Sequence, residues 1–393
     1  VGDTVPLRVI SDAGSNLCES PLERGGRVAA VTNDVIMVSD TASPAELSDV
    51  QLQEIATEFG ELVRPVSVEN FGEPTDIDEN DRVIVFFTPV VNEREAGGFF
   101  FAGDLFPRSE CSASNEGEIF YIVSPDPHGE TPIEVDAELV AELATGIIGH
   151  EFQHLINAGR RIYVNDATTL EEVWLNEGLS HIAEELLFYE AASLGPGENI
   201  GLSRLQSSQE IADAANRYLL NNLFHYAQYA AAPGAATFLG LDNSPTRGAA
   251  WAYLRYAADQ EESADAQFFF DLANARTAGF ENLNSALESV SALDLFQAWT
   301  ASVFSDDRVA GVPTFLTQPS WDYRSILPIF TEDNTFPLNV QAVEAGGGVQ
   351  VGLTGGGAAF FRVAVDPGAT GDFHVDAAGT SPSALRVSVV RAR

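Results

Sequence analysis

The sequence of 393 residues contains no lysine, so all 20 of its basic residues are arginine, against 58 Asp and Glu. The formal net charge is -38, and no basic cluster stands out along the chain. Because such a surface repels phosphate backbones and anionic lipids, the composition argues against nucleic-acid and membrane-surface binding. It also argues against intrinsic disorder, since 25 Phe, 9 Tyr and 4 Trp supply many large apolar groups for a core.

Cysteines and long apolar runs are equally scarce. Cys18 and Cys111 are the only cysteines, which excludes a zinc site made of thiolates and a disulfide-dense scaffold. They predict one disulfide in an exported protein and two buried thiols otherwise. No run approaches the roughly 18 apolar residues of a membrane span, so we predict none. The start at Val1 lacks a charged segment and an apolar core. We therefore expect the processed form of a secreted, extracellular protein rather than a cytosolic one.

The distribution of apolar residues predicts an α+β protein whose first part is rich in strands and whose second part is helical. Residues 1–125 carry β-branched and aromatic runs that predict strands at 5–10, 27–38 and 82–89. A helix capped by Ser43 is expected at 44–63. Residues 126–310 are mostly of helical pattern, and the Pro-rich residues 311–334 are expected to form a linker.

The last residues, 335–393, have a different pattern and are predicted to form a small all-β accessory domain. Apolar and polar residues alternate there between Gly-rich turns. Strands are expected at 349–353, 360–365, 373–375 and 385–390. The predicted domains are therefore 1–334 and 335–393.

One segment carries the residues of metal chemistry. His150-Glu151-Phe152-Gln153-His154 is an HExxH sequence within a helix predicted at 136–158, which Gly159 is expected to end. The two histidines are four residues apart, so they project from one helix face and can share a metal. Glu151 is turned by about 100° from His150, so it lies beside the metal and can act as a general base. The alternative is a helix with a solvated glutamate and two unrelated histidines.

A second helix supplies a third candidate ligand. Its predicted start is a capping box formed by Thr169 and Glu172, just before Trp174-Leu175-Asn176-Glu177-Gly178-Leu179-Ser180-His181. Catalytic zinc takes three protein ligands and keeps one open position. Glu177 follows His154 by 23 residues and is the predicted third ligand. His181 is either the competing ligand or a group that supports the ligands or stabilises the transition state. A surface position is the remaining alternative for Glu177.

These residues resemble a known group of enzymes. HEFQHLIN followed by WLNEG is similar to the gluzincin metallopeptidases, and most of all to the hyicolysin family of neutral metallopeptidases. The resemblance extends through 97–106, 114–121 and 247–256 and covers about residues 70–305. It implies a zincin-like catalytic domain with one Zn²⁺ bound by His150, His154 and Glu177, and with Glu151 as general base.

The sequence departs from two patterns of related enzymes. Thermolysin-like enzymes place an Asp one turn after the glutamate ligand, and His181 occupies that position here. Aminopeptidases that share WLNEG also carry a GxMEN motif, which this sequence lacks. An endopeptidase is therefore favoured over an amino-terminal exopeptidase.

Several weaker candidates complete the predicted site. A donor to the tetrahedral oxyanion is expected among His181, His225, Tyr218, Tyr226, Tyr253 and Tyr256, although aromatic residues at helical spacing are also typical of a core. The strand at 118–123 is either an edge strand that binds substrate by β-augmentation or an interior strand. Asp76, Asp78 and Asn80 resemble the start of a Ca²⁺ loop, but Asp81 stands where such a loop has Gly. An acidic turn is the alternative.

The sequence thus predicts a secreted zinc metalloendopeptidase that acts on protein or peptide substrates. Two other classes remain open. One is a non-catalytic surface-binding protein on a zincin scaffold, and the other is a zinc exopeptidase or amidase, because a fold and a ligand set do not by themselves select the substrate. The sequence does not indicate an oligomeric state.

Overall fold

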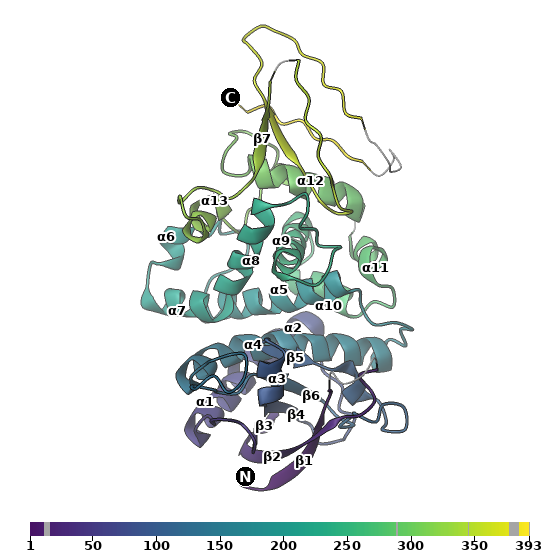
Figure 1. Ribbon diagram of the computed structural model, residues 1–393. Coiled ribbons are helices and arrows are strands. Elements are labelled where there is room, and N and C mark those ends of the chain that lie inside the picture. Colours follow the sequence, from purple (N-terminus) through teal and green to yellow (C-terminus); the bar gives the residue numbers. More distant parts are fainter. Residues whose placement is uncertain (12–15, 288–289, 345, 377–384, 393) are drawn as a thin grey trace. The chain divides into compact units, whose positions relative to one another are not determined.

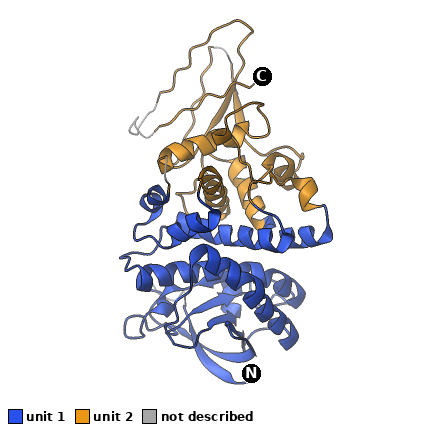
Figure 2. Cartoon of the chain, turned by 180° about the vertical axis from the view of Figure 1, so that it is seen from behind, with its two compact units in different colours: residues 1–195, 207–220, 263–286 blue, residues 196–206, 221–262, 287–393 orange. Residues whose placement is uncertain are grey.

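A computed structural model describes residues 1–11, 16–287, 290–344, 346–376 and 385–392. The chain divides into two compact units, shown in different colours in Figure 2. The first unit comprises residues 1–195, 207–220 and 263–286, and the second comprises 196–206, 221–262 and 287–393. None of the helices in the described ranges combines the length and the hydropathy of a transmembrane span.

The first unit is built on a six-stranded mixed sheet. Its strands are β1 (Thr4–Val9), β2 (Leu22–Val31), β3 (Val35–Asp40), β4 (Val83–Phe87), β5 (Gly98–Phe100) and β6 (Ile119–Ile122). They lie in the order β1-β2-β3-β4-β6-β5, with β3, β4 and β6 parallel and the remaining pairs antiparallel. The strands predicted at 5–10 and 82–89 are confirmed, whereas the strand predicted at 27–38 is two strands joined by a turn.

The position of β6 decides between the two interpretations of residues 118–123. Because the short strand β5 pairs antiparallel with its outer side, β6 is an interior strand. All four of its residues are buried, as expected for a strand covered on both faces. The edge strand on this side of the sheet is β5.

Helices pack on this sheet and on one another. Those of the first unit are α1 (Asp49–Glu58), α2 (Arg64–Phe71), α3 (Pro89–Glu93), α4 (Ala137–Gly159), α5 (Val173–Ala192), α7 (Gln209–Tyr218), α10 (Asp265–Ala273) and α11 (Gly279–Ala286), with helical turns η1 (Phe59–Val63), η2 (Ala102–Leu105) and η3 (Arg160–Val164). The long helix α4 packs on β5 and β6 and along α5 (Figure 1). The HExxH residues therefore lie between the sheet edge and a second helix.

Two predicted helix starts differ from the structure. The helix expected at 44–63 begins at Asp49, and its cap is Ser48 rather than Ser43, because the side chains and backbones of Ser48 and Gln51 form a reciprocal capping box. Helix α5 begins at Val173 after Glu172 and not in a capping box at Thr169.

The predicted end of the HExxH helix is also different. Helix α4 begins after its cap Asp136, within one residue of the start predicted at 136, but Gly159 does not end the helical path, which continues into the π-helical turn η3. A Cβ atom at Gly159 would lie 2.7 Å from Thr75 Oγ1. The glycine is therefore explained by close packing and not by helix termination.

A disulfide joins Cys18 to Cys111, with the Cα atoms 4.6 Å apart, which confirms the predicted pairing. The bond packs in a cluster with Ile10 and Ala113, against which Phe99 of β5 and Phe101 also lie. Closing a loop with a sequence separation of 93 residues restricts the unfolded chain and stabilises the fold by about 4–5 kcal/mol in the loop-entropy model. The crosslink thus supports the region next to the sheet edge.

The second unit is mainly helical. It contains α6 (Leu202–Leu205), α8 (Leu220–Ala231), α9 (Ser244–Gln260), α12 (Ala292–Ser305) and α13 (Tyr323–Ile326), together with the turns η4 (Thr314–Leu316) and η5 (Leu327–Phe330). Its core is aromatic, with Tyr229 stacked on Trp299. The stretch expected as a linker contains η4, α13 and η5 and buries Trp321 and Ile326, so it is packed rather than extended.

The carboxyl-terminal segment has less strand than predicted. Strands β7 (Val340–Val343) and β8 (Phe360–Val363) form a parallel pair, and β8 matches the strand expected at 360–365. Within the described residues, 349–353, 373–375 and 385–390 are not strands. Exposed apolar side chains alternate there, as at Val349, Val375 and Val389, but alternation alone does not form a ladder without a partner strand. The domain boundary at 335 stays a prediction.

Candidate metal centre

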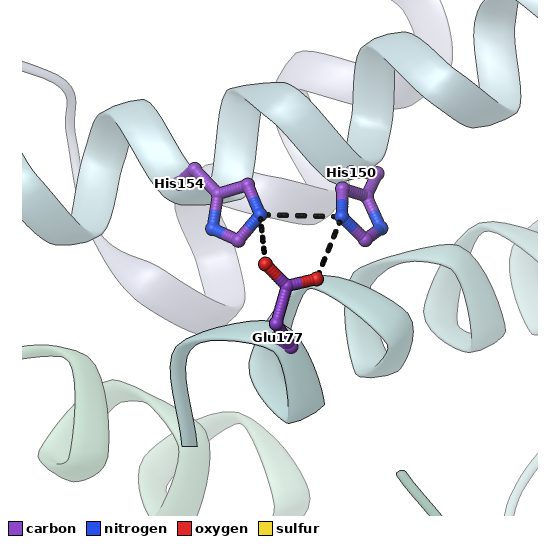
Figure 3. A group of neighbouring side chains, drawn as sticks. All are labelled: His150, His154 and Glu177. Atoms are coloured by element: carbon purple, nitrogen blue, oxygen red, sulfur yellow. Dashed lines mark hydrogen bonds and ion pairs between the residues drawn. The ribbon is translucent and has the colours of Figure 1, made fainter. Parts of the chain in front are cut away.

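Three donor groups converge from two helices (Figure 3). His150 and His154 lie on one face of α4, and Glu177 lies near the start of α5. The Nε2 atoms of the histidines are 3.2 Å apart. The Glu177 oxygens are 3.6 Å from His150 Nε2 and 3.5 Å from His154 Nε2. Tetrahedral zinc with bonds of about 2.0–2.2 Å separates its ligand atoms by about 3.3–3.6 Å. The spacing therefore fits zinc.

The other ring nitrogens fix how these histidines face the centre. His150 Nδ1 is 2.7 Å from the Glu184 carboxylate, so Nδ1 carries the proton. His154 Nδ1 is 3.0 Å from Ser180 Oγ. The Ser180 hydroxyl donates to Gln153 Oε1 at 2.7 Å, so its oxygen accepts from His154. Both Nε2 atoms are then acceptors that face a carboxylate, and a cation between them relieves the repulsion of three acceptors.

The pKa values of His150 and Glu184 also indicate a site that binds positive charge. Burial lowers the pKa of His150, but its hydrogen bonds with Glu177 and Glu184 outweigh burial and raise it to about 10. Burial raises the pKa of Glu184, but the imidazoles of His181 and His150 lower it to about 2. In the metal-free protein a proton therefore takes the place of a cation, and the site attracts positive charge.

The candidate general base lies between the donors and the sheet edge. Glu151 follows His150 on α4 and is 5% exposed. A Cβ atom built on Gly98 of β5 would lie 3.0 Å from Glu151 Oε1 and 2.8 Å from Ile147 Cγ2. The backbone of the edge strand thus lies directly against the Glu151 carboxyl group.

His181 lies next to the metal centre, but it is not one of the three converging donors. It is 1% exposed, and its Nδ1 is 3.1 Å from Glu184 Oε1. His150, His181 and Glu184 form a second set of neighbouring donors, but the 2.7 Å between His150 and Glu184 is a hydrogen bond and is shorter than the spacing of two metal ligands. Sequence reasoning missed Glu184. Its signal is the seven-residue spacing from Glu177, which places both on one helix face.

The other candidates for an oxyanion donor lie in other surroundings. The Tyr218 hydroxyl, in the first unit, donates to Glu58 at 2.7 Å. In the second unit, Tyr253 donates to the carbonyl of Ala292 at 2.6 Å, and Tyr256 donates to a carbonyl at 2.5 Å. These three hydroxyls have structural partners. His225 and Tyr226 are buried in the second unit, and their role stays a prediction.

The acidic segment before β4 brings part of the expected calcium ligands together. Asp76, Asp78 and the buried Glu118 place carboxylate oxygens within 4.8 Å of one another. Asp76 accepts from the backbone of Asn80 at 2.9 Å, and the Asn80 side chain donates to Asp78 at 2.5 Å. These contacts also describe an acidic turn closed by its own hydrogen bonds, so Ca²⁺ at Asp76, Asp78 and Asn80 stays a prediction.

Part of the chain is similar to a known enzyme. The neutral metalloprotease ShpI of Staphylococcus hyicus is 26% identical to it over 142 residues, which are 36% of this chain and 32% of that protein. The chain thus spans about a third of the length of this curated relative. No protein-family model matches the chain. Among common metal ions, two imidazoles and one carboxylate are a donor set that suits zinc. Placement in the hyicolysin family stays a prediction.

Proposed function

We propose that the chain is a secreted zinc-dependent endopeptidase in which His150, His154 and Glu177 hold the metal and Glu151 is the general base. The observation that carries this proposal is the convergence of three acceptor groups, at the spacing of tetrahedral zinc ligands, beside a buried carboxylate. The distant similarity to a neutral metalloprotease supports peptide hydrolysis. The disulfide and the acidic composition support export.

The chain's own groups have distinct tasks in this reaction. When bound, Zn²⁺ supplies Lewis acidity, which polarises the scissile carbonyl and makes a neighbouring water acidic near neutral pH. Glu151 accepts the proton of the attacking water and returns it to the amine that leaves. Glu184 and Ser180 hold the two imidazoles in the tautomer that presents Nε2 to the centre.

The sheet edge provides a place for the substrate. Strand β5 ends the sheet, and Gly98 brings its backbone against Glu151. An extended peptide that adds to β5 as a further strand would run past the candidate base. Substrate binding by β-augmentation is one of the two interpretations that the sequence allows for residues 118–123, and we assign it to residues 98–100.

Cleavage of casein by the zinc-loaded chain tests the proposal. We expect Glu151→Gln to bind about one zinc per chain, as the wild type does, and to lose activity by about 10²–10⁴-fold. Glu138→Gln is the matched control, because Glu138 is an exposed glutamate in the first turn of the same helix. Equal activity in Glu151→Gln and the wild type would remove Glu151 from the mechanism.

Internally quenched peptides with blocked ends separate endopeptidases from exopeptidases, because an exopeptidase cannot cut them. We expect cleavage within these peptides. A wild type that binds zinc but cuts only peptides with free termini would identify an exopeptidase. A wild type that binds zinc and cuts no peptide would favour an amidase or a non-catalytic binding protein.

A further inference from the structure

We propose that Glu184 is a positioning residue of the metal centre, which orients the ligand His150 and is itself held in place by His181. This inference rests on the proposed function, because it assigns Glu184 a task toward the same metal. It adds to the predicted set a carboxylate that lies two helical turns after Glu177.

The contacts of Glu184 carry the proposal. Its Oε1 atom lies 2.7 Å from His150 Nδ1 and 3.1 Å from His181 Nδ1. Since Nδ1 and Nε2 lie on opposite sides of an imidazole ring, Glu184 supports His150 from the side away from Glu177. A carboxylate in this position fixes the tautomer and the ring plane of a histidine ligand and makes its Nε2 more basic.

The helical geometry explains why a carboxylate at this distance along the chain reaches His150. Glu177, His181 and Glu184 are spaced by four and three residues, so they lie on one face of α5, the helix that packs along α4. His181 occupies the turn between the two glutamates. The residue that supports His150 is therefore supplied one turn later, at Glu184.

The burial of His181 restricts what it can do. With 1% of its surface exposed, its ring is covered by protein. Its Nδ1 faces Glu184, and the His150 and His181 ring centroids are 4.8 Å apart. A glutamate side chain has more freely rotating bonds than an aspartate, and the ion-pair contact of Glu184 with His181 Nδ1 helps to offset the entropy cost of holding its carboxylate against His150. We therefore assign His181 to holding Glu184 rather than to the substrate.

Zinc affinity, measured on the full chain by competition with a chelator, tests the role of Glu184. We expect Glu184→Gln, which keeps the size of the side chain and removes its charge, to bind zinc about 10- to 100-fold more weakly. The Co²⁺-loaded variant should also show a changed visible absorption spectrum, because the orientation of a ligand ring is altered. Glu185→Gln is the matched control. Glu185 is a fully buried glutamate on the same helix that accepts from Tyr189, and we expect near wild-type zinc affinity.

Two further variants keep the test decisive if Glu184→Gln folds poorly. Glu184→Asp retains the charge but shortens the reach, so it should recover part of the zinc affinity. His181→Gln should weaken zinc binding in the same direction but by less, and adding it to Glu184→Gln should cause little further loss. This non-additivity would show that His181 acts through Glu184.

The outcomes separate this inference from the proposed function. If the wild type binds zinc and cleaves casein, and Glu184→Gln binds zinc within twofold of the wild type with an unchanged Co²⁺ spectrum, the positioning role is wrong and the peptidase proposal stands. If the wild type binds no zinc, both proposals fall. Equal losses of affinity in Glu184→Gln and Glu185→Gln would mean that the effect is general destabilisation, and would also overturn the inference.

Discussion

Gly98 lies where the sheet edge meets the candidate base, so a single methyl group there tests the geometry of the site. An alanine Cβ would lie 3.0 Å from Glu151 Oε1 and 2.8 Å from Ile147 Cγ2, so one or both side chains must shift. We expect Gly98→Ala to lower kcat on casein by at least about tenfold, because small displacements of a catalytic group are costly. Zinc content should stay unchanged, since the donors lie elsewhere on α4 and α5.

The neighbouring glycine offers the control for this substitution. A Cβ atom at Gly97 would approach Ile147 Cδ1 at 3.1 Å and has no close contact with Glu151. Gly97→Ala should therefore retain most of the kcat of the wild type. Full activity in Gly98→Ala would show that the Glu151 carboxylate is not held against the strand.

His150 and Glu184 make the stability of the metal-free protein depend on pH. The pKa of His150 rises from 6.5 to about 10, so its stabilisation is complete below about 6.5 and is lost as the pH rises through 10. The pKa of Glu184 falls from 4.5 to about 2, so its stabilisation is complete above 4.5 and is lost as the pH falls through 2. The two contributions are therefore largest together between about pH 4.5 and 6.5.

Thermal unfolding of the EDTA-treated chain between pH 5 and 10 measures this dependence. We expect Tm to fall from pH 6 toward pH 10 and expect the fall to be smaller in His150→Asn, which has no such proton to lose. Zinc affinity should rise over the same range, since metal binding displaces the proton. A wild type and a variant with the same pH profile would contradict the assignment.

The two histidine ligands could be predicted from their spacing in the sequence. The residues that orient them could not, because their contacts are made between two helices. His150 and His154 are one helical turn apart, so their common face follows from the sequence. The relation of Glu184 to His150 spans 34 residues and depends on how α4 packs on α5. Ser180 likewise orients His154 only across that interface. The spacing along α5 places Glu184 on the face of Glu177, but it does not show which histidine of α4 the carboxylate contacts.

The arrangement of α5 against α4 depends on a buried ion pair in the connection between them. Arg161 and Glu171 are 3.1 Å apart, and their side chains are 0% and 1% exposed. Arg161 also donates to the carbonyls of Ala275 and Thr277 at 3.1 and 3.0 Å, and Glu171 accepts from the backbone of Gly279 at 2.6 Å. The pair joins the end of α4, the start of α5 and the start of α11.

Removing one member of this pair should be severely destabilising. We expect Arg161→Met to lower the free energy of unfolding by about 3–5 kcal/mol, because it leaves the Glu171 charge buried without its partner. Arg276→Met is the control, since Arg276 and Asp166 form an ion pair whose side chains are 70% and 81% exposed, and it should change stability by less than about 1 kcal/mol. Urea unfolding measures both. Equal small effects would show that the buried pair does not hold the connection.

Contacts near the end of α4 and the start of α5 explain why these helix boundaries were harder to predict than the helices themselves. Thr169 and Glu172 match a capping box, but Glu172 accepts from Trp174 Nε1 at 2.8 Å and Thr169 supplies a carbonyl to Arg161. Gly159 matches a helix end, but it is explained by the approach of Thr75. Tertiary contacts thus override local signals. The patterns of α4 and β4 are strong enough that their existence follows from periodicity alone.

At the scale of the whole molecule, the charge balance sets how stability responds to salt. With 58 acidic against 20 basic residues, like-charge repulsion disfavours the compact state. Arginine forms ion pairs with acidic partners, as Arg27 does with Glu46 and Asp49, but the carboxylates outnumber the arginines by almost three to one. The fold therefore tolerates repulsion that dissolved ions can screen.

We expect the Tm of the zinc-loaded chain at pH 8 to rise steadily as NaCl increases from about 0.05 to 1 M, because the Debye length falls from more than 10 Å to about 3 Å. The same series at pH 5 is the control. Carboxylates begin to gain protons as the pH approaches the isoelectric value near 4.2, so the repulsion and the rise in Tm should both be smaller. A Tm that is independent of salt at pH 8, or that falls, would mean that attractive ion pairs outweigh the net repulsion of -38 charges.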